Sequence, residues 1–163
     1  MIVVSDTTPL ISLLKIDRLD LLEKLFGQVL IPEGVFHELT ENESYSDEAE
    51  MIRSCDFIQI RPVDRSSVYL FQKRTGLDLG ESEAIVLTEE LGADLTLLDE
   101  RQARAVASNI GLAIMGTVGI LGTALHRGYL TADDLRQYIK IFKENRRHID
   151  ENLFQRLLGS DRG

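Results

Sequence analysis

The N-terminal stretch Ile2-Val3-Val4-Ser5-Asp6-Thr7-Thr8-Pro9-Leu10 contains a turn from a strand into a helix. Residues 2–4 are a short β-branched run, which is typical of a buried strand. Thr7 and Pro9 follow, and threonine and proline are favoured at the start of a helix. A strand that leads directly into a helix is the first half of a βα unit, and Asp6 lies at its turn.

The same alternation continues along the chain. Further short apolar runs, each predicted to be a strand, occupy residues 29–31, 57–60, 95–98 and 112–115. Helices are predicted between and after them, at residues 17–25, 32–39, 47–53, 66–74, 81–91, 101–109, 117–126, 132–142 and 150–158. Strands that alternate with helices pair in parallel and are covered on both faces. The pattern therefore predicts an α/β fold, a three-layer α/β/α sandwich around a central parallel sheet.

Composition limits the classes of protein. The 163 residues fit one domain, and 44% hydrophobic with 28% charged residues excludes a wholly disordered chain. No apolar run is long enough to span a membrane, and residues 1–6 lack the basic region of a signal peptide. The single cysteine, Cys55, fits a reducing compartment. We therefore expect a cytoplasmic protein with no membrane partner.

The charge balance is acidic. The chain carries 18 Lys and Arg against 27 Asp and Glu, a formal net charge of −9. Such a chain repels polyanions at long range, which argues against a general DNA-coating or membrane-surface protein. The same balance is compatible with an enzyme whose acids hold divalent cations, because those cations attract phosphates.

Two aspartates follow predicted strands directly. Asp6 ends the first strand and Asp99 ends the strand at 95–98. Ligand sites of open α/β sheets lie outside the carboxyl ends of the strands, so both carboxylates face one crevice if these strands are neighbours. The alternative for each aspartate is a cap on the helix that follows it.

A glutamate falls on a predicted buried helix face. If a helix runs from Ile31 to Leu39, Glu38 lies between Ile31 and Val35 on its apolar stripe. Burial of an unpaired carboxylate is costly, so a cation, an arginine or a metal should compensate its charge. The alternative is a frayed first turn that rotates Glu38 outward.

The helix at 81–91 offers two more acids. Glu81 shares the inward face of Ala84 and Ile85, whereas Glu83 lies near the edge of that face. Glu81 is the better candidate for a ligand, and the choice between the two stays open. The alternative for Glu81 is a capping box, in which Asp78 is the N-cap and Glu81 reaches back to it.

Asp6, Glu38, Glu81 and Asp99 thus converge on one edge from four separate elements. An all-oxygen carboxylate cluster suits Mg²⁺ or Mn²⁺ rather than zinc or iron. One or two such ions activate a water and stabilise the leaving oxygen in phosphodiester hydrolysis. The pattern favours a metal-dependent phosphodiesterase.

Four segments together carry a resemblance to a known family. They are Val3-Val4-Ser5-Asp6-Thr7, Val35-Phe36-His37-Glu38-Leu39, Gly80-Glu81-Ser82-Glu83-Ala84-Ile85 and Leu97-Leu98-Asp99-Glu100-Arg101. As an ordered set they resemble the PIN domain family, metal-dependent ribonucleases that include many toxins of prokaryotic toxin–antitoxin pairs. The chain looks most like the branch with an Asp-Thr-x-Pro-Leu start and a Gly-Glu-x-Glu-Ala motif. The resemblance covers residues 1–128.

The resemblance implies a function and a site. Asp6, Glu38, Glu81 and Asp99 match the family's acidic quartet, which would bind Mg²⁺ or Mn²⁺ and catalyse RNA hydrolysis, and Thr7 matches a hydroxyl residue beside the first acid. It also implies an antitoxin partner and a homodimer. Residues 129–163 extend past the usual domain end, as a helical extension that packs on the domain or contacts a partner. Many relatives have Asp where this chain has Glu81, which is a second reason why Glu83 remains a candidate.

Two arginines and two other functional classes complete the expectations. Arg101 and Arg104 follow Asp99 on its helix, within reach of a substrate phosphate. A PIN-like module that binds nucleic acid or regulates without strong catalysis is one alternative. A phosphohydrolase or receiver-like domain that uses Asp6 or Asp99 as a phosphate acceptor is another, and the lack of a phosphate-binding loop motif argues against it.

Overall fold

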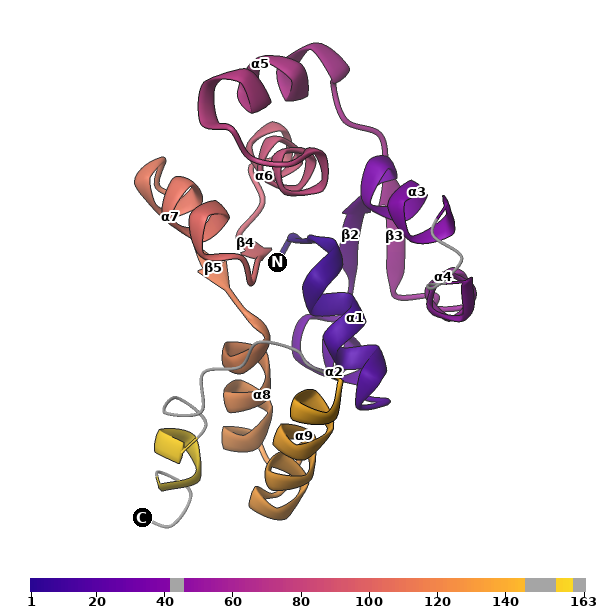
Figure 1. The fold of residues 1–163 in the computed structure, drawn as a ribbon, viewed down its shortest axis with the longest axis vertical. Helices are drawn as coiled ribbons and strands as arrows, with labels where there is room; N and C mark the ends of the chain where they lie inside the picture. Colours follow the sequence, from indigo (N-terminus) through magenta and orange to yellow (C-terminus); the bar gives the residue numbers. More distant parts are fainter. Residues whose placement is uncertain (42–45, 146–154, 160–163) are drawn as a thin grey trace.

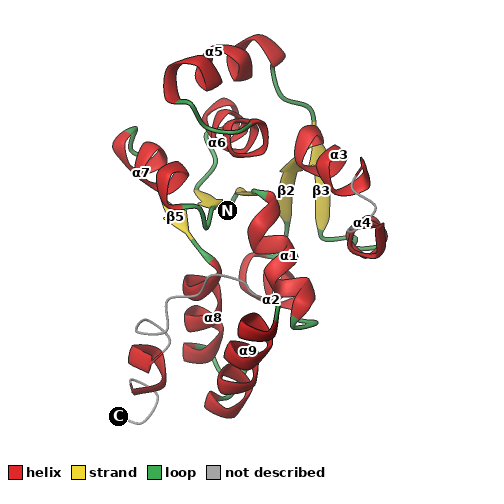
Figure 2. Ribbon diagram, viewed as in Figure 1, coloured by secondary structure: helices red, strands yellow, loops and turns green. Residues whose placement is uncertain are grey.

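A five-stranded parallel sheet forms the centre of the protein, as a computed structural model shows (Figures 1 and 2). The structure describes residues 1–41, 46–145 and 155–159. The strand order is β3-β2-β1-β4-β5, and every neighbouring pair is parallel. The strands are β1 (Val3–Ser5), β2 (Val29–Pro32), β3 (Ile58–Arg61), β4 (Leu95–Leu97) and β5 (Ile114–Met115). The chain adds β2 and β3 on one side of β1 and then crosses to add β4 and β5 on the other.

Helices connect the strands and cover both faces of the sheet. They are α1 (Thr7–Lys15), α2 (Asp20–Phe26), α3 (Glu33–Glu41), α4 (Ser46–Arg53), α5 (Arg65–Thr75), α6 (Leu79–Leu91), α7 (Arg101–Asn109), α8 (Thr117–His126) and α9 (Ala132–Glu144). Residues 155–159 are also helical. Figure 1 shows α5, α6 and α7 on one side of the strands and α1, α2, α8 and α9 on the other.

Alternation along the strands creates two cores. Val3 belongs to the core that includes α1, α2, α8 and α9, whereas its neighbour Val4 belongs to the core under α5, α6 and α7. In β2, Val29 and Ile31 face the first core and Leu30 faces the second. Both faces of these strands are therefore buried, as parallel sheets require. The predicted three-layer α/β/α sandwich is confirmed.

The helix α6 is the most deeply placed helix of its layer. Every residue from 80 to 88 is buried. The Thr88 hydroxyl bonds with that of Thr96 in β4 over 2.8 Å, so α6 and the sheet are joined by a buried polar contact as well as by apolar packing. This helix is consequently a rigid base for the acidic residues of its first turn.

The start of one predicted helix matters for the site and differs from the structure, and two other predicted segments fall partly on residues that the structure does not describe. Residues 31 and 32 belong to β2, so α3 begins at Glu33 rather than at residue 31 or 32. Pro32 is the last residue of β2, supplies no N–H to the ladder and directly precedes α3. Residues 150–154 of the helix predicted at 150–158, and residues 42–45 of the loop before α4, lie outside the described residues.

Helix α9 shares a core with the N-terminal half of the chain. Leu135 and Phe142 of α9 are buried in the same cluster as Leu10 and Leu13 of α1. The Arg18 guanidinium donates to the Tyr138 hydroxyl over 2.9 Å and so ties α9 to the turn after α1. The domain boundary at residue 128 stays a prediction. Over the described ranges, no helix combines the length and the apolar character of a membrane span.

Truncation of Phe142 tests whether α9 contributes to this core. The Phe142 side chain is 1% exposed, so Phe142→Ala should lower the free energy of unfolding by about 3–5 kcal/mol. Leu70→Ala is the control, because Leu70 is 64% exposed and its truncation should cost under about 0.5 kcal/mol. Urea denaturation followed by circular dichroism measures both. Equal, small effects would mean that α9 does not belong to the core.

Candidate active site

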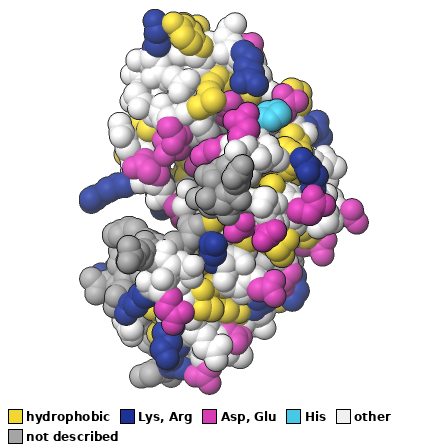
Figure 3. All heavy atoms as spheres, turned by 45° about the vertical axis from the view of Figure 1, so that its right-hand side comes forward, with side chains coloured by type: hydrophobic (Ala, Val, Ile, Leu, Met, Phe, Trp, Pro, Cys, Tyr) yellow, Lys and Arg dark blue, Asp and Glu magenta, His cyan; other side chains and the backbone are white. Residues whose placement is uncertain are grey.

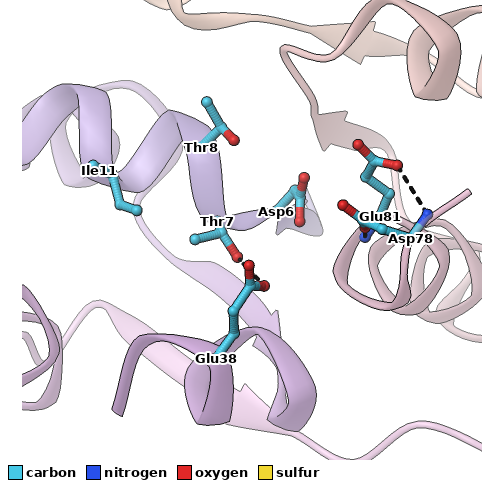
Figure 4. A pocket seen from close by; sticks show the side chains of 7 residues that line it. All are labelled: Asp6, Thr7, Thr8, Ile11, Glu38, Asp78 and Glu81. Carbon is cyan, nitrogen blue, oxygen red and sulfur yellow. Dashed lines mark hydrogen bonds between the residues drawn. The ribbon is translucent and has the colours of Figure 1, made fainter. Parts of the chain in front are cut away.

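A small acidic pocket lies at the carboxyl end of β1 (Figure 4). Its volume is about 130 Å³. It is lined by Asp6, Thr7, Thr8, Ile11, Glu38, Asp78 and Glu81. The pocket therefore contains four carboxylates from three parts of the chain, and among the described residues no lysine or arginine lines it. Acidic side chains are also spread over the face shown in Figure 3, and several lie close together in its upper half.

Asp6 lies at the turn between β1 and α1, where the chain leaves the sheet. Its amide donates to the carbonyl of Leu97 over 3.1 Å, which continues the pairing of β1 with β4 past Ser5. It occupies the N-cap position of α1, yet its side chain makes no capping hydrogen bond in the described part of the chain. The carboxylate is instead left facing the pocket, with the whole residue only 5% exposed.

Glu38 comes to the pocket from α3. The Thr7 hydroxyl donates to Glu38 Oε2 over 3.2 Å, so the residue after Asp6 holds the glutamate beside it. The predicted burial of Glu38 is wrong, because the residue is exposed. Ile31, which anchored that prediction, lies in β2 and not on the helix, so it does not define the face of α3. Glu38 is a solvent-exposed residue whose side chain extends into the pocket.

Asp78 and Glu81 begin α6 and form the capping box that the sequence offered as an alternative. The Glu81 amide donates to Asp78 Oδ1 over 2.8 Å, and the Asp78 amide donates to Glu81 Oε2 over 3.2 Å. Both side chains also line the pocket, so the capping role does not remove Glu81 from the site. Gly80 lies between them, and a Cβ there would stand 2.9 Å from Glu38 Oε2 and 3.3 Å from Asp6 Oδ1. Lack of a side chain at Gly80 is what lets these carboxylates approach α6.

Burial and mutual repulsion raise the pKa of two of these acids. Burial, followed by the charges of Asp78, Glu81 and Glu38, raises the pKa of Asp6 to about 7, against a lowering by the Thr7 amide. Burial and the charge of Asp78 raise the pKa of Glu81 to about 7. Without a cation, the pocket thus retains protons near neutral pH.

Asp99 lies at the same edge of the sheet but has other partners. Its Oδ1 accepts from the Thr117 amide over 2.6 Å and its Oδ2 from the Thr117 hydroxyl over 2.6 Å. The cap on α7 is Glu100, so Asp99 does not cap the helix that follows it; its carboxylate accepts instead from Thr117, the first residue of α8, whose N-cap is Gly116. β1 and β4 are neighbours, as the shared crevice requires, but Asp99 is not among the residues that line the pocket.

The two arginines after Asp99 differ in their surroundings. Arg104 donates to the carbonyl of Leu98 over 2.9 Å. Its Nη1 and Asp99 Oδ1 each lie 2.8 Å from where a Cβ of Gly116 would stand, so the two side chains meet at that glycine. Arg101 is exposed at the start of α7. Arg104 and Asp99 form one side of the crevice, next to the acidic pocket.

Glu83 is buried away from the pocket. The prediction that it lies near the edge of the inward face of α6 is wrong, because it is 0% exposed. Its carboxylate lies against Gly34 of α3, where a Cβ would overlap it, and 3.6 Å from Nη1 of Arg65. Of the two glutamates, Glu81 lines the pocket and Glu83 does not.

The donor set of the pocket fits a hard divalent cation. Its carboxylate oxygens are the ligands that Mg²⁺ and Mn²⁺ prefer, and among the described residues no lysine or arginine lines the pocket to offset their charge. Over residues 1–41, 46–145 and 155–159, however, no three acidic, histidine or cysteine side chains are arranged so that they could hold an ion together. Ligation therefore requires rotation of at least one of the long arms, Glu38 or Glu81.

The sequence alone did not predict that three residues of this region belong to the site. Asp78 was considered only as a cap, although its position at the start of the helix of Glu81 places it beside the same pocket. Thr8 follows Thr7 and was interpreted only as part of a helix start. Thr117 is 18 residues from Asp99, and no local pattern connects the two.

Comparison with known proteins identifies the family. The PIN domain family model matches residues 2–161, so the chain belongs to the PIN domain family, whose members are generally nucleases. The match extends through α9. No curated protein matches this sequence.

A solved structure supports the fold. The crystal structure of PAE2754 from Pyrobaculum aerophilum is similar, with a TM-score of 0.54 and 14% sequence identity. The similarity covers 71% of this chain and 83% of that chain. At this identity the likeness concerns the arrangement of the sheet and helices alone.

The pH dependence of stability tests the electrostatics of the pocket. The pKa of Asp6 is about 7 in the folded protein and 3.8 in the unfolded chain. Between these two pH values the folded state therefore binds more protons than the unfolded state. Stability of the metal-free protein should therefore fall as pH rises from about 4 to about 7, by about 2–4 kcal/mol. Asp6→Asn should make that fall clearly smaller, and the part that remains comes from Glu81, whose pKa is also raised, as measured by urea denaturation in EDTA.

Asp56→Asn is the control for this measurement. Asp56 is exposed and precedes β3 at the amino edge of the sheet, away from the pocket. Its substitution should leave the pH profile of the wild type unchanged. A profile of Asp6→Asn that still falls as steeply as the wild type would contradict the electrostatic account.

Proposed function

We propose that the protein is a Mg²⁺- or Mn²⁺-dependent endoribonuclease that hydrolyses RNA phosphodiester bonds at this edge of the sheet. The observation that carries the proposal is the pocket of four carboxylates, of which Asp6 and Glu81 have a raised pKa, with no lining lysine or arginine among the described residues. Membership of a family whose members are generally nucleases supports the same chemistry. Asp6, Glu38, Glu81 and Asp99 are the proposed metal-binding and catalytic residues.

A bound divalent ion would neutralise the carboxylates and lower the pKa of a water beside them. The residues of the chain have separate tasks. Asp6 is fixed by its backbone bond to β4, and Thr7 orients Glu38 towards it. One of the four acids would accept the proton of the attacking water.

The reaction would be an in-line displacement at phosphorus. The water oxygen forms a bond to phosphorus while the bond from phosphorus to the 3′ oxygen breaks, which leaves a 5′-phosphate and a 3′-hydroxyl. Arg101 and Arg104 are the proposed contacts for the substrate phosphates, and Thr7 lies beside the reacting group. Asp99 would act from the other side of the crevice, where Thr117 fixes its direction.

The cellular role that we propose follows the family resemblance. The chain would act in the cytoplasm as the toxin of a toxin–antitoxin pair, as a homodimer, with an antitoxin protein that covers the site. The extension from residue 129 would pack on the domain or contact the partner.

Cleavage of RNA tests the proposed reaction. The wild-type protein with Mn²⁺ should cleave a generic single-stranded RNA and leave 5′-phosphate ends, and EDTA should stop it. Asp6→Asn should lower kcat by about 100-fold or more. Asp56→Asn should cleave as the wild type does. Inactivity of the wild type with several metals would favour a binding or regulatory module instead.

Thermal unfolding tests the metal without any substrate. Mn²⁺ at about 100 times its Kd should raise the free energy of unfolding of the wild type by about 2.7 kcal/mol. The same addition should stabilise Asp56→Asn equally and Asp6→Asn much less. Stabilisation of Asp6→Asn to the full extent would place the ion outside this pocket.

A further inference from the structure

The helices α3 and α6 meet at two points, and each point pairs a glycine of one helix with a glutamate of the other. At the first, Gly80 of α6 faces the carboxylate of Glu38 from α3. At the second, Gly34 of α3 faces the carboxylate of Glu83 from α6. A Cβ on Gly34 would overlap the buried Glu83 carboxylate, whereas a Cβ on Gly80 would stand 2.9 Å from Glu38 Oε2 and would displace the end of that exposed side chain.

The two contacts fix how the helices lie against each other. Glu38 follows Gly34 by four residues on α3, about one helical turn. Glu83 follows Gly80 by three residues on α6. The order of the contacts is opposite on the two helices, so a shift of one helix along the other would disturb both contacts, and the contact of the buried Glu83 is the less adaptable of the two. The position of Glu38 relative to Asp6 is thus linked to the contact between Glu83 and Gly34.

The burial of the Glu83 carboxylate lowers the stability of the fold. Glu83 is 0% exposed, and among the described residues its carboxylate has no side-chain hydrogen-bond partner; its polar neighbours are the Gly34 amide of α3 and the Arg65 guanidinium. The nearest cation is the Arg65 guanidinium at 3.6 Å, on a side chain that is itself 65% exposed. Burial of a carboxylate with so little compensation lowers stability, whereas an apolar residue would not. Glu83 faces the first turn of α3, where the helix dipole favours a negative charge.

We propose that Glu83 is a positioning residue, which holds α3 through Gly34 so that Glu38 stands opposite Asp6. The inference rests on the proposed function, because it assigns to Glu83 a task for the metal-binding pocket. It also resolves the choice between the two glutamates of α6. Glu81 is the pocket residue, and Glu83 acts through the neighbouring helix.

The test uses Mn²⁺ affinity by calorimetry and thermal unfolding of the metal-free protein. The variants are Glu83→Ala, Glu83→Gln, Gly34→Ala and the double variant Gly34→Ala with Glu83→Ala. Glu89→Gln is the matched control, because Glu89 is an exposed glutamate on the same helix. Glu83→Ala should weaken Mn²⁺ binding by about 10-fold, the lower end of what outer partners of metal ligands contribute. Glu83→Gln, which keeps the shape of the contact, should bind within about threefold of the wild type, and Glu89→Gln should bind as the wild type does.

The Gly34→Ala variants test the contact itself. Gly34→Ala alone should lower both the Tm and the Mn²⁺ affinity, because its Cβ displaces the Glu83 carboxylate. In the Glu83→Ala background the same substitution should have no further cost, since the space is then free. Such non-additivity is the signature of a direct contact. If Glu83→Ala does not fold, Glu83→Gln and Gly34→Ala still decide the question.

Each failure has its own signature. Loss of binding in Glu83→Gln equal to that in Glu83→Ala would make Glu83 a ligand and overturn the positioning role. Mn²⁺ binding by the wild type that none of the Glu83 or Gly34 variants weakens would overturn this inference and leave the proposed function intact. Failure of the wild type to bind Mn²⁺ at all would overturn both.

Discussion

The concentration of negative charge around Asp6 is the constraint on which the rest of the structure depends. Asp6 ends a strand that is buried on both faces, so its carboxylate cannot turn away into solvent. Glu38, Asp78 and Glu81 surround the same pocket, and burial together with their charges raises the pKa of Asp6 to about 7. This arrangement costs folding free energy in the absence of a cation. The two apolar cores on either side of the sheet supply the stability that tolerates it.

Local helix signals and the site use the same residues at the start of α6. The capping box and the pocket were alternatives when the sequence was considered alone, because a side chain was expected to serve one purpose. In the structure, Glu81 bonds to the amide of Asp78 and lines the pocket at once. Gly80 between them leaves room for Glu38 and Asp6. The first turn of α6 thus contains the helix cap and two pocket acids, and its glycine leaves space for the carboxylates of Glu38 and Asp6.

Periodicity predicted the fold well and the directions of side chains less well. The parallel sheet and most helix bounds follow from apolar runs and turn residues, whereas the pairing of β1 with β4 was only a condition of the sequence argument and is shown by the structure. The orientation predicted for Glu38 was wrong because the prediction counted Ile31 as a helical residue. Ile31 belongs to β2, and α3 begins only at Glu33. The burial of Glu83 was missed because a wheel treats one helix in isolation. The space that receives Glu83 is made by Gly34 on another helix, and a wheel drawn for α6 does not contain it.

The acids at this edge of the sheet fall into two groups by how firmly they are held. Asp99 is fixed by two hydrogen bonds of 2.6 Å from Thr117, a residue of the next βα turn. Glu38 has one longer hydrogen bond, 3.2 Å from Thr7, and lies open to solvent. A site that must exchange its ion and its substrate needs both kinds of residue, since fixed groups define geometry and movable arms complete the coordination. Because Glu38 is the movable arm, the precision of the pocket depends on the placement of its helix. That is why a buried, poorly compensated glutamate on the facing helix makes physical sense.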